Sequence, residues 1–416
     1  MSSRSAKSSG VHWPTVVQFA GSGLGLAFFW TSAAGVTVVG LYELILNPAE
    51  PQVATEAFFL AWAAAWVGFL LLPSVIHTFA RLSGRPVLRL EFKGRPNILL
   101  PILFLLIYLV TLTAGHLTTQ IPGLAWITLP PLHILAATLP LGWIVFASIR
   151  KLDLGSRQRK WGTLAAGLTL GPALALTFEL LLGAALFLVA AIYIGLNPGL
   201  MSNLDALIAI LENSNFSQQE LIQALSDLLG DPFLYTLVIL NFSVFVPIIE
   251  EIVKPIAVWL LLLLGPLSPA AGFGLGLISG AGFALLENLF SGASLDAWAG
   301  TAAIRVGATA FHLGTSALMG WGIVRARNER SYGKLAGIYL LSIMLHGAWN
   351  AIVVETSLGP GLTAEGSLFP FEITLISGLA LSGITVISLG LLAFIRRQVL
   401  RAPSTRRGVN RPKIIE

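Results

Sequence analysis

Residues 246–264 have the sequence VPIIEEIVKPIAVWLLLLL, an apolar stretch of membrane-spanning length that carries two adjacent glutamates and a lysine. Glu250 lies four residues and Glu251 three residues before Lys254, so on a helix the ammonium reaches at least one carboxylate on its own face. A proline on either side of this group removes a backbone hydrogen bond. Broken helices that carry charge line polar cavities, so the stretch predicts a polar site inside a bundle of membrane helices.

The whole chain has the composition of a membrane protein. Of its 416 residues, 55% are hydrophobic and 11% are charged, and the mean hydropathy is +0.81. A soluble domain carries about 25% charged residues. Apolar stretches of about 20 residues recur along the chain, and we expect membrane spans at 21–46, 56–79, 97–118, 123–148, 162–195, 233–263, 270–291, 301–324, 335–356 and 371–395. The predicted fold class is all-α, a polytopic bundle of about ten transmembrane helices.

Positive charges between the spans predict the orientation, because short loops rich in lysine and arginine stay in the cytoplasm. Lysines and arginines gather before the first span, after the second, fourth and eighth spans, and in the tail, at residues 4–7, 81–95, 150–160, 325–334 and 396–416. Both termini are therefore expected to be cytoplasmic. The excess of positive charge follows from topology and contact with the lipid bilayer, so no nucleic-acid partner is expected.

The loop 196–232 contains no lysine or arginine and is expected to lie outside the cytoplasm. Its apolar residues recur at helical spacing and predict two short amphipathic helices. Such helices serve either as a lid or substrate-docking element on the membrane surface, or as a hairpin that caps the bundle.

Polarity divides the chain into regions. The first five spans contain few ionisable groups, whereas the sixth to ninth contain many. We expect an N-terminal cytoplasmic tail, a five-helix accessory region, an extracytoplasmic amphipathic loop, a catalytic core, a last transmembrane helix and a basic cytoplasmic tail, at 1–20, 21–195, 196–232, 233–356, 357–395 and 396–416.

Further polar residues interrupt the seventh, eighth and ninth spans. They are Phe283-x-x-x-Glu287-Asn288, a mid-span His312, and His346-x-x-x-Asn350. An ionisable side chain in hydrocarbon costs roughly 2.5 to 3.5 kcal/mol, so these groups are expected to turn inward and to share one site with the glutamates of the sixth span. A ridge of small residues, Gly272-x-x-x-Gly276-x-x-x-Gly280-x-x-x-Ala284, predicts close approach of a second helix just before Glu287.

Lone polar groups of the first half are expected to be structural. His77, His116 and His133 stand near span ends or prolines, where hydrogen-bonded histidines are common. Glu179 lies in the middle of the fifth span. We favour a structural hydrogen bond for it over an accessory role at the site.

The chemistry of the shared site is limited by what the chain lacks. It contains no cysteine, which excludes disulfides, thiolate nucleophiles and cysteine metal ligands. Glu250 or Glu251 is the candidate base that takes a proton from water, while His312 and His346 position that water or stabilise an oxyanion. In supporting roles, Lys254 tunes the glutamate pair, Phe283 packs beside the site, and Asn288 and Asn350 are candidate oxyanion donors. Glu287 shares a proton, protonates a leaving amine, or binds a metal.

The four motifs together resemble the PrsW family of intramembrane proteases, which is related to the type II CAAX prenyl proteases and the Abi-type immunity proteins. The resemblance covers residues 233–356. The CAAX branch has Glu-Glu-x-x-x-Arg and Phe-x-x-x-His, whereas here Lys254 comes one position earlier and Glu287 stands in place of the histidine. The resemblance implies hydrolysis of peptide bonds in a membrane-protein or peptide substrate, regulated proteolysis in signalling, and a bacterial or archaeal plasma membrane.

Two questions stay open at this point. Glu287, His312 and His346 are candidate ligands of Zn²⁺, but no His-Glu-x-x-His motif selects them, so a metal-assisted and a metal-free glutamate mechanism are both compatible with the residues. Intramembrane carboxylates and histidines also occur in proton- or ion-coupled transporters, and a protease-like receptor or immunity protein needs no catalysis. Confinement of the polar groups to one half of the chain speaks against the inverted repeat of a transporter.

Overall fold

The computed structural model describes residues 12–47, 51–86, 99–213, 217–291, 295–358 and 373–401, and every regular element in these ranges is a helix. In the described part of the chain, nine helical stretches are long and apolar enough to cross a membrane. The protein is therefore an all-α polytopic bundle, as the composition predicts. Most of the expected N-terminal tail, part of the basic loop 81–95, and most of the tail 396–416 lie outside the described residues.

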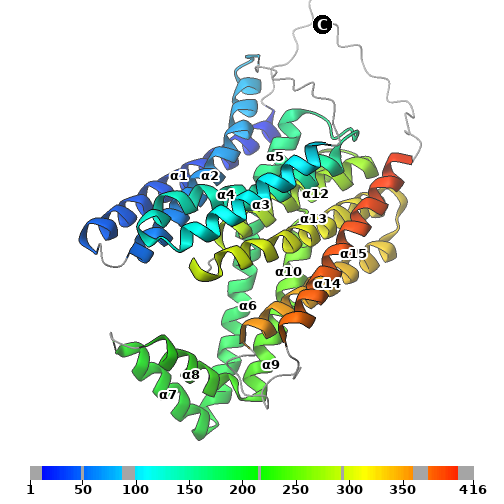
Figure 1. The fold of residues 1–416 in the computed structure, drawn as a ribbon. Helices are drawn as coiled ribbons and strands as arrows, with labels where there is room; N and C mark the ends of the chain where they lie inside the picture. Colours follow the sequence, from blue (N-terminus) through cyan, green and yellow to red (C-terminus); the bar gives the residue numbers. More distant parts are fainter. Residues whose placement is uncertain are drawn as a thin grey trace, which may run out of the picture.

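Figure 1 shows the helices in chain order. They are α1 (Trp13–Leu46), α2 (Pro51–Leu82), α3 (Leu99–Thr119), α4 (Pro122–Ile149), α5 (Arg157–Leu168), α6 (Leu170–Gly195), α7 (Pro198–Glu212), α8 (Gln218–Leu229), α9 (Pro232–Leu240), the π-helix η1 (Asn241–Phe245), α10 (Val246–Val253), α11 (Ile256–Leu264), α12 (Pro269–Phe290), the short 3₁₀ helix η2 (Leu295–Ala297), α13 (Trp298–Glu329), α14 (Tyr332–Leu358) and α15 (Ile373–Arg401). The first helix begins before residue 21 because Pro14 suits the first turn of a helix.

Two of the expected spans are divided. The span predicted at 162–195 consists of α5 and α6, which meet at Thr169. The span predicted at 233–263 consists of four pieces, α9, η1, α10 and α11. The last break falls at Lys254 and Pro255, where the Ser279 hydroxyl donates a hydrogen bond to the Lys254 carbonyl oxygen over 2.6 Å. Proline therefore interrupts the helix where the sequence predicts it, and a neighbouring helix satisfies the Lys254 carbonyl, to which Val258 does not donate because its N–H bonds the Pro255 carbonyl.

Helix α13 corresponds to the span predicted at 301–324 and is not among the nine apolar stretches. It is long enough to cross a membrane, but it carries Arg305, His312 and many small or hydroxyl residues. Most of its middle is buried by other helices. A helix enclosed by protein needs less apolar surface than one that faces lipid, so α13 is the polar centre of the bundle.

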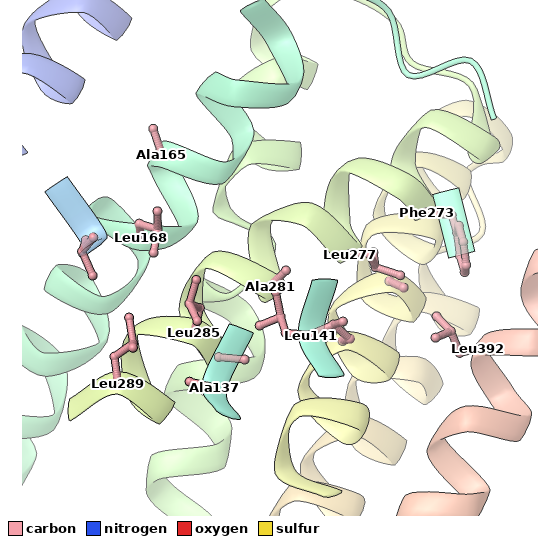
Figure 2. Close-up of a cluster of buried hydrophobic side chains, with 14 of the residues drawn as sticks. Ala137, Leu141, Ala165, Leu168, Phe273, Leu277, Ala281, Leu285, Leu289 and Leu392 are labelled. Carbon is pink, nitrogen blue, oxygen red and sulfur yellow. The ribbon is translucent and has the colours of Figure 1, made fainter. Parts of the chain in front are cut away.

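The small-residue ridge of α12 packs directly on α13. A Cβ atom added at Gly276 would lie 2.4 Å from the Ser316 carbonyl oxygen, and one at Gly320 would lie 2.4 Å from the Gly272 carbonyl oxygen. Only glycine allows the two backbones to come this close, as the ridge predicts. The adjacent face of α12 carries Leu277, Ala281 and Leu285 into an apolar cluster with residues of α2, α4, α5 and α15 (Figure 2).

Helices α7 and α8 form the two amphipathic helices expected in the loop 196–232, and they lie beside the end of α6, apart from the main bundle (Figure 1). Ser217 caps α8 by accepting a hydrogen bond from the backbone N–H of Glu220 over 3.2 Å, and its own backbone N–H donates to the Glu220 carboxylate over 2.8 Å. These hydrogen bonds from Ser217 lower the pKa of Glu220. The start of α8 is thus fixed by local sequence.

Candidate active site

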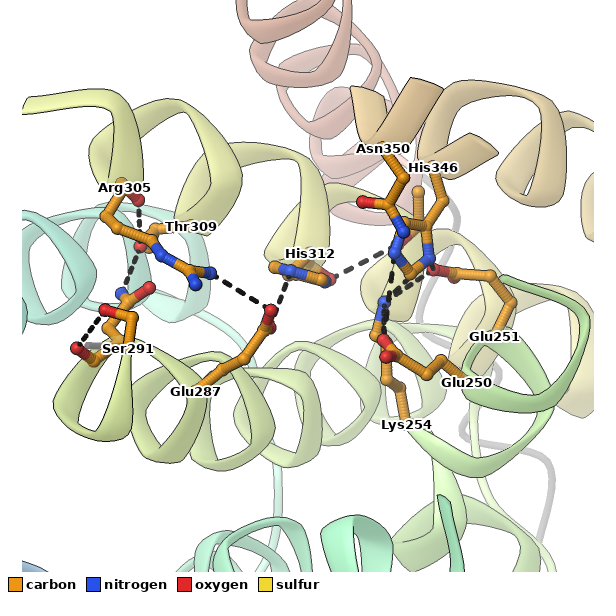
Figure 3. A network of polar contacts seen from close by, with 12 residues as sticks. Glu250, Glu251, Lys254, Glu287, Ser291, Arg305, Thr309, His312, His346 and Asn350 are labelled. Carbon is orange, nitrogen blue, oxygen red and sulfur yellow. Dashed lines mark hydrogen bonds and ion pairs between the residues drawn. The ribbon is translucent and has the colours of Figure 1, made fainter. Parts of the chain in front are cut away.

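The broken sixth span delivers two carboxylates and an ammonium to the centre of the bundle. Lys254 Nζ lies 2.7 Å from Glu251 Oε1 and 3.1 Å from Glu250 Oε2, so the lysine pairs with both glutamates of its own helix. His346 of α14 approaches the same group, with Nδ1 3.0 Å from Glu251 Oε1 and 3.2 Å from Lys254 Nζ. Its other nitrogen, Nε2, lies 3.8 Å from Glu250 Oε2. Figure 3 shows the four side chains converging from α10 and α14.

Lys254 is fully enclosed, which is rare for a lysine and needs compensation. Besides the two carboxylates, its ammonium faces the rings of Phe283 and Phe311, with 5.4 Å and 5.6 Å from Nζ to the ring centres. Cation–π contacts of this kind are worth about 2 kcal/mol or more where water is excluded. Phe283 therefore packs against the lysine, in agreement with the packing role predicted for it.

A second charged group forms around Glu287 of α12. His312 Nε2 lies 2.9 Å from Glu287 Oε2, and Arg305 Nη1 donates a hydrogen bond to Glu287 Oε1 over 3.0 Å (Figure 3). Each carboxylate oxygen therefore has its own partner from α13. Arg305 was not among the residues predicted for the site, although an arginine inside a predicted span is itself a signal of a buried charge.

The two groups meet through their imidazoles. The rings of His312 and His346 are 5.3 Å apart between centres, and the tilted ring of Phe311 lies near both, at 4.0 Å and 5.2 Å. We call Glu250, Glu251, Lys254, Glu287, Arg305, His312 and His346 the ionic cluster. All five residues predicted to be catalytic belong to it, and four helices supply it, as the sequence predicts.

The two asparagines have partners outside the ionic cluster. Asn350 Nδ2 donates to the Phe242 carbonyl oxygen of η1 over 2.9 Å, and Asn288 Nδ2 donates to Thr309 Oγ1 over 2.7 Å. Gly347, between His346 and Asn350, lies against the Ser243 carbonyl of the same π-helix. Asn350 thus ties α14 to the π-helix that precedes the glutamates, and both amides are engaged away from the carboxylates.

Accessibility differs among the three carboxylates. The side chain of Glu251 is fully buried, that of Glu250 is 11% exposed and that of Glu287 is 36% exposed. Glu251 uses one oxygen, Oε1, for both Lys254 and His346. Water or a substrate therefore has access to Glu250 and Glu287, whereas Glu251 is enclosed among its partners.

Among the other predicted residues, His133 is buried in a hydrogen-bonded group. Its Nε2 lies 3.3 Å from the Leu289 carbonyl oxygen, and its Nδ1 lies 3.3 Å from Nε1 of Trp298. This arrangement agrees with the structural role expected for it. His77 is half-buried on α2 and His116 is exposed on α3.

Glu179 lies on α6 and comes close enough to the ionic cluster to interact electrostatically with Lys254 and Glu287. Its Oε1 is enclosed and has no hydrogen-bond partner among the described residues. The structural hydrogen bond that the sequence analysis favoured for Glu179 is therefore missing for this oxygen.

The ionic cluster contains the types of donor group that bind metal ions. Imidazole and carboxylate groups suit zinc chemically. Within the described ranges, however, no three histidine, aspartate or glutamate side chains converge closely enough to hold a metal ion. The ammonium of Lys254 instead stands between Glu250, Glu251 and His346. As they are arranged, these residues do not fit a zinc site.

The chain matches the model of a known protein family over the region that contains this cluster. The model of the PrsW family, described as intramembrane metalloproteases, matches residues 171–381, which is just over half of the chain. The match runs from the start of α6 into α15 and includes every member of the ionic cluster. No curated protein and no solved structure matches the chain. The chain thus belongs to the PrsW family of intramembrane proteases.

Proposed function

We propose that this protein is an endopeptidase that hydrolyses peptide bonds of membrane-protein substrates by means of a water molecule activated by Glu250. The observation that carries the proposal is the proximity of two glutamate–histidine groups. Glu250 and Glu251 lie beside His346, Glu287 lies beside His312, and the centres of the two imidazole rings are 5.3 Å apart. Hydrolysis of an amide needs a base, an acid and a stabiliser of the oxyanion, and this arrangement supplies candidates for each.

The cluster has the charge balance that acid–base chemistry requires. Its three carboxylates exceed its two permanent cations, Lys254 and Arg305, by one negative charge when both imidazoles are neutral. Excess charge is costly in a buried site, so uptake of one proton is favourable. That proton is the one a water molecule gives up when it attacks a carbonyl carbon.

Glu250 is the better candidate for the base, because it is reachable and Glu251 is not. Glu250 takes a proton from water as the water oxygen bonds to the carbonyl carbon of the scissile peptide. Glu251 holds Lys254 and His346 in place through its Oε1. Because Glu251 accepts from His346 Nδ1, the proton of the neutral ring is on Nδ1 and the Nε2 acceptor faces Glu250, while the Lys254 ammonium is the group that stabilises the oxyanion.

The second pair completes the reaction. Arg305 holds Glu287, and Glu287 in turn accepts from His312 Nε2, which leaves His312 Nδ1 as a free acceptor that orients the attacking water. The carbon–nitrogen bond then breaks, and the leaving amine takes the proton stored on Glu250. Atoms and protons balance without an external acid.

No step of this mechanism uses a metal ion. The family is described as metalloproteases, whereas in this chain Lys254 stands where a cation would have to bind Glu250 and Glu251. We therefore propose that an ammonium supplies the positive charge of the site and that a membrane-permeable chelator leaves cleavage unchanged.

The proposal also assigns the regions of the chain and their orientation in the membrane. Helices α9 to α14 (residues 233–356) form the catalytic core, α1 to α6 (residues 21–195) form an accessory region, and both termini lie in the cytoplasm of a bacterial or archaeal cell. The amphipathic helices α7 and α8 lie on the opposite side of the plasma membrane, and cleavage serves regulated proteolysis in signalling.

The test is mass-spectrometric mapping of new peptide termini in membranes that contain the wild type, Glu250→Gln or Glu56→Gln, each with and without chelator. Glu56 is an exposed carboxylate on α2, so its variant controls for loss of a charge. We expect termini that appear with the wild type and with Glu56→Gln, disappear with Glu250→Gln, and persist with chelator. Equal termini with folded, equally abundant Glu250→Gln would overturn the proposed function.

A further inference from the structure

Helix α6 is attached to the bundle at its two ends and is open between them. Near its start, Ala175 packs with Val253 and Phe283 beside the ionic cluster. Near its end, the Tyr193 ring lies 4.3 Å from that of Phe233 between centres, and the Tyr193 hydroxyl donates to Asp231 Oδ2 over 3.2 Å. After Ala175, no residue of α6 is buried.

The open part of α6 has the length of a membrane span. Tyr193 lies eighteen positions after Ala175, which corresponds to about 27 Å of helix, against about 30 Å for a hydrocarbon core. The face that turns toward α9 and α10 carries Glu179, Gly183, Leu186 and Ala190, all of which are only half-buried. A Cβ atom added at Gly183 would meet no atom of another element within 4 Å. We call this face and the space beside it the α6 window.

Glu179 connects the window to the ionic cluster. It lies one turn from Gly183 on the same face, and it interacts electrostatically with Lys254 and Glu287. Its enclosed Oε1 has no hydrogen-bond partner in the described part of the chain. A buried carboxylate oxygen without a donor is costly, so this oxygen gains by accepting a hydrogen bond from a bound molecule.

We infer that the α6 window admits the transmembrane segment of a protein substrate, and that Glu179 accepts hydrogen bonds from its backbone N–H groups as the segment unwinds at the ionic cluster. Within hydrocarbon, a peptide segment is helical because its backbone N–H and C=O groups are then hydrogen-bonded to one another. Cleavage requires local unwinding, which frees N–H donors. Lipid chains fit the apolar window equally well but offer no donor to Glu179. The inference rests on the proposed function, because it names the route by which a substrate reaches the same site.

The absence of cysteine from the chain allows the window to be blocked after folding. Gly183→Cys is purified, alkylated with a bulky maleimide, and reconstituted in liposomes with a substrate found by terminus mapping. Gly390→Cys on α15 is the matched control, because Gly390 is also a helical glycine with no atom of another element within 4 Å of its Cβ position. The unmodified protein of each variant supplies the reference rate against which its alkylated form is compared.

We expect alkylation to slow cleavage by Gly183→Cys roughly tenfold or more, which corresponds to about 1.4 kcal/mol, and to leave Gly390→Cys unchanged. Cleavage by alkylated Gly183→Cys at the rate of its unmodified form would overturn the inference and assign the window to lipid. Equal slowing of both alkylated variants would also overturn it. Absence of cleavage by the wild type would instead overturn the proposed function on which the inference rests.

Discussion

Helices α6 and α12 carry similar apolar sequences but occupy opposite environments. In the span that contains α6, 6% of the most apolar window is buried, whereas in α12 the figure is 83%. The buried helix is the less apolar of the two. In a soluble protein the order would be reversed, because burial there is driven by water.

The difference follows from the solvent. Lipid tails are as apolar as leucine, so apolar side chains do not drive one membrane helix onto another. Helix α12 is buried because its glycines fit against α13, and it carries Glu287 because the interior of the bundle supplies Arg305 and His312 as partners. Helix α6 lacks such a ridge and keeps its leucines and phenylalanines exposed.

The largest expected effect is a difference in cleavage kinetics between substitutions of Glu287 on α12 and Glu179 on α6. Glu287→Gln on α12 should lower kcat by about 10² to 10⁴, the range for loss of an acid–base group, because His312 loses the charge that orients it. Glu179→Gln on α6 should raise KM about tenfold and leave kcat nearly unchanged, since it weakens binding alone. Cleavage kinetics in liposomes measure both. Equal losses of kcat would remove the distinction between a residue of the cluster and one of the window.

The next effect concerns stability. Gly276→Leu on α12 should destabilise the fold by about 3 kcal/mol, because its Cβ would collide with the Ser316 backbone. Gly183→Leu on α6 should be neutral or stabilise by about 0.5 kcal/mol, because the space is open and leucine favours helix. Unfolding in lipid bicelles with increasing detergent compares the two. A stable Gly276→Leu protein would show that the ridge does not hold α12 against α13.

A smaller effect on kcat tests the hydrogen bond from Arg305 of α13 to Glu287 of α12. Arg305→Gln should lower kcat about tenfold, because one oxygen of Glu287 loses its partner. Arg305→Lys should recover part of this loss, since it restores the charge without the planar guanidinium. A change in KM alone, with kcat preserved, would assign Arg305 to substrate binding.

Local spacing predicted the parts of the site that one helix supplies. The pairing of Lys254 with Glu250 and Glu251 follows from offsets of four and three residues, and the packing of α12 on α13 follows from the glycine ridge. The break at Lys254 and Pro255 was equally readable, because proline removes a backbone hydrogen bond.

Contacts between distant segments were not predictable in the same way. The partner of Asn350 is the Phe242 carbonyl of η1; Pro247 signals a freed carbonyl in this stretch, but not that Asn350 of a distant helix donates to it. The division of the fifth span at Thr169 was not predicted, although Gly171 and Pro172 stand in the first turn of α6. Arg305 was visible in the sequence, but only the fold shows that it faces Glu287.

The most direct measurement of the central claim is cleavage by purified protein in liposomes that contain only the enzyme and its substrate. The account predicts that the wild type cleaves the substrate, that Glu250→Gln does so at least about 100-fold more slowly, and that both proteins have the same unfolding midpoint. Cleavage by Glu250→Gln at the wild-type rate would contradict the assignment of the ionic cluster as the active site.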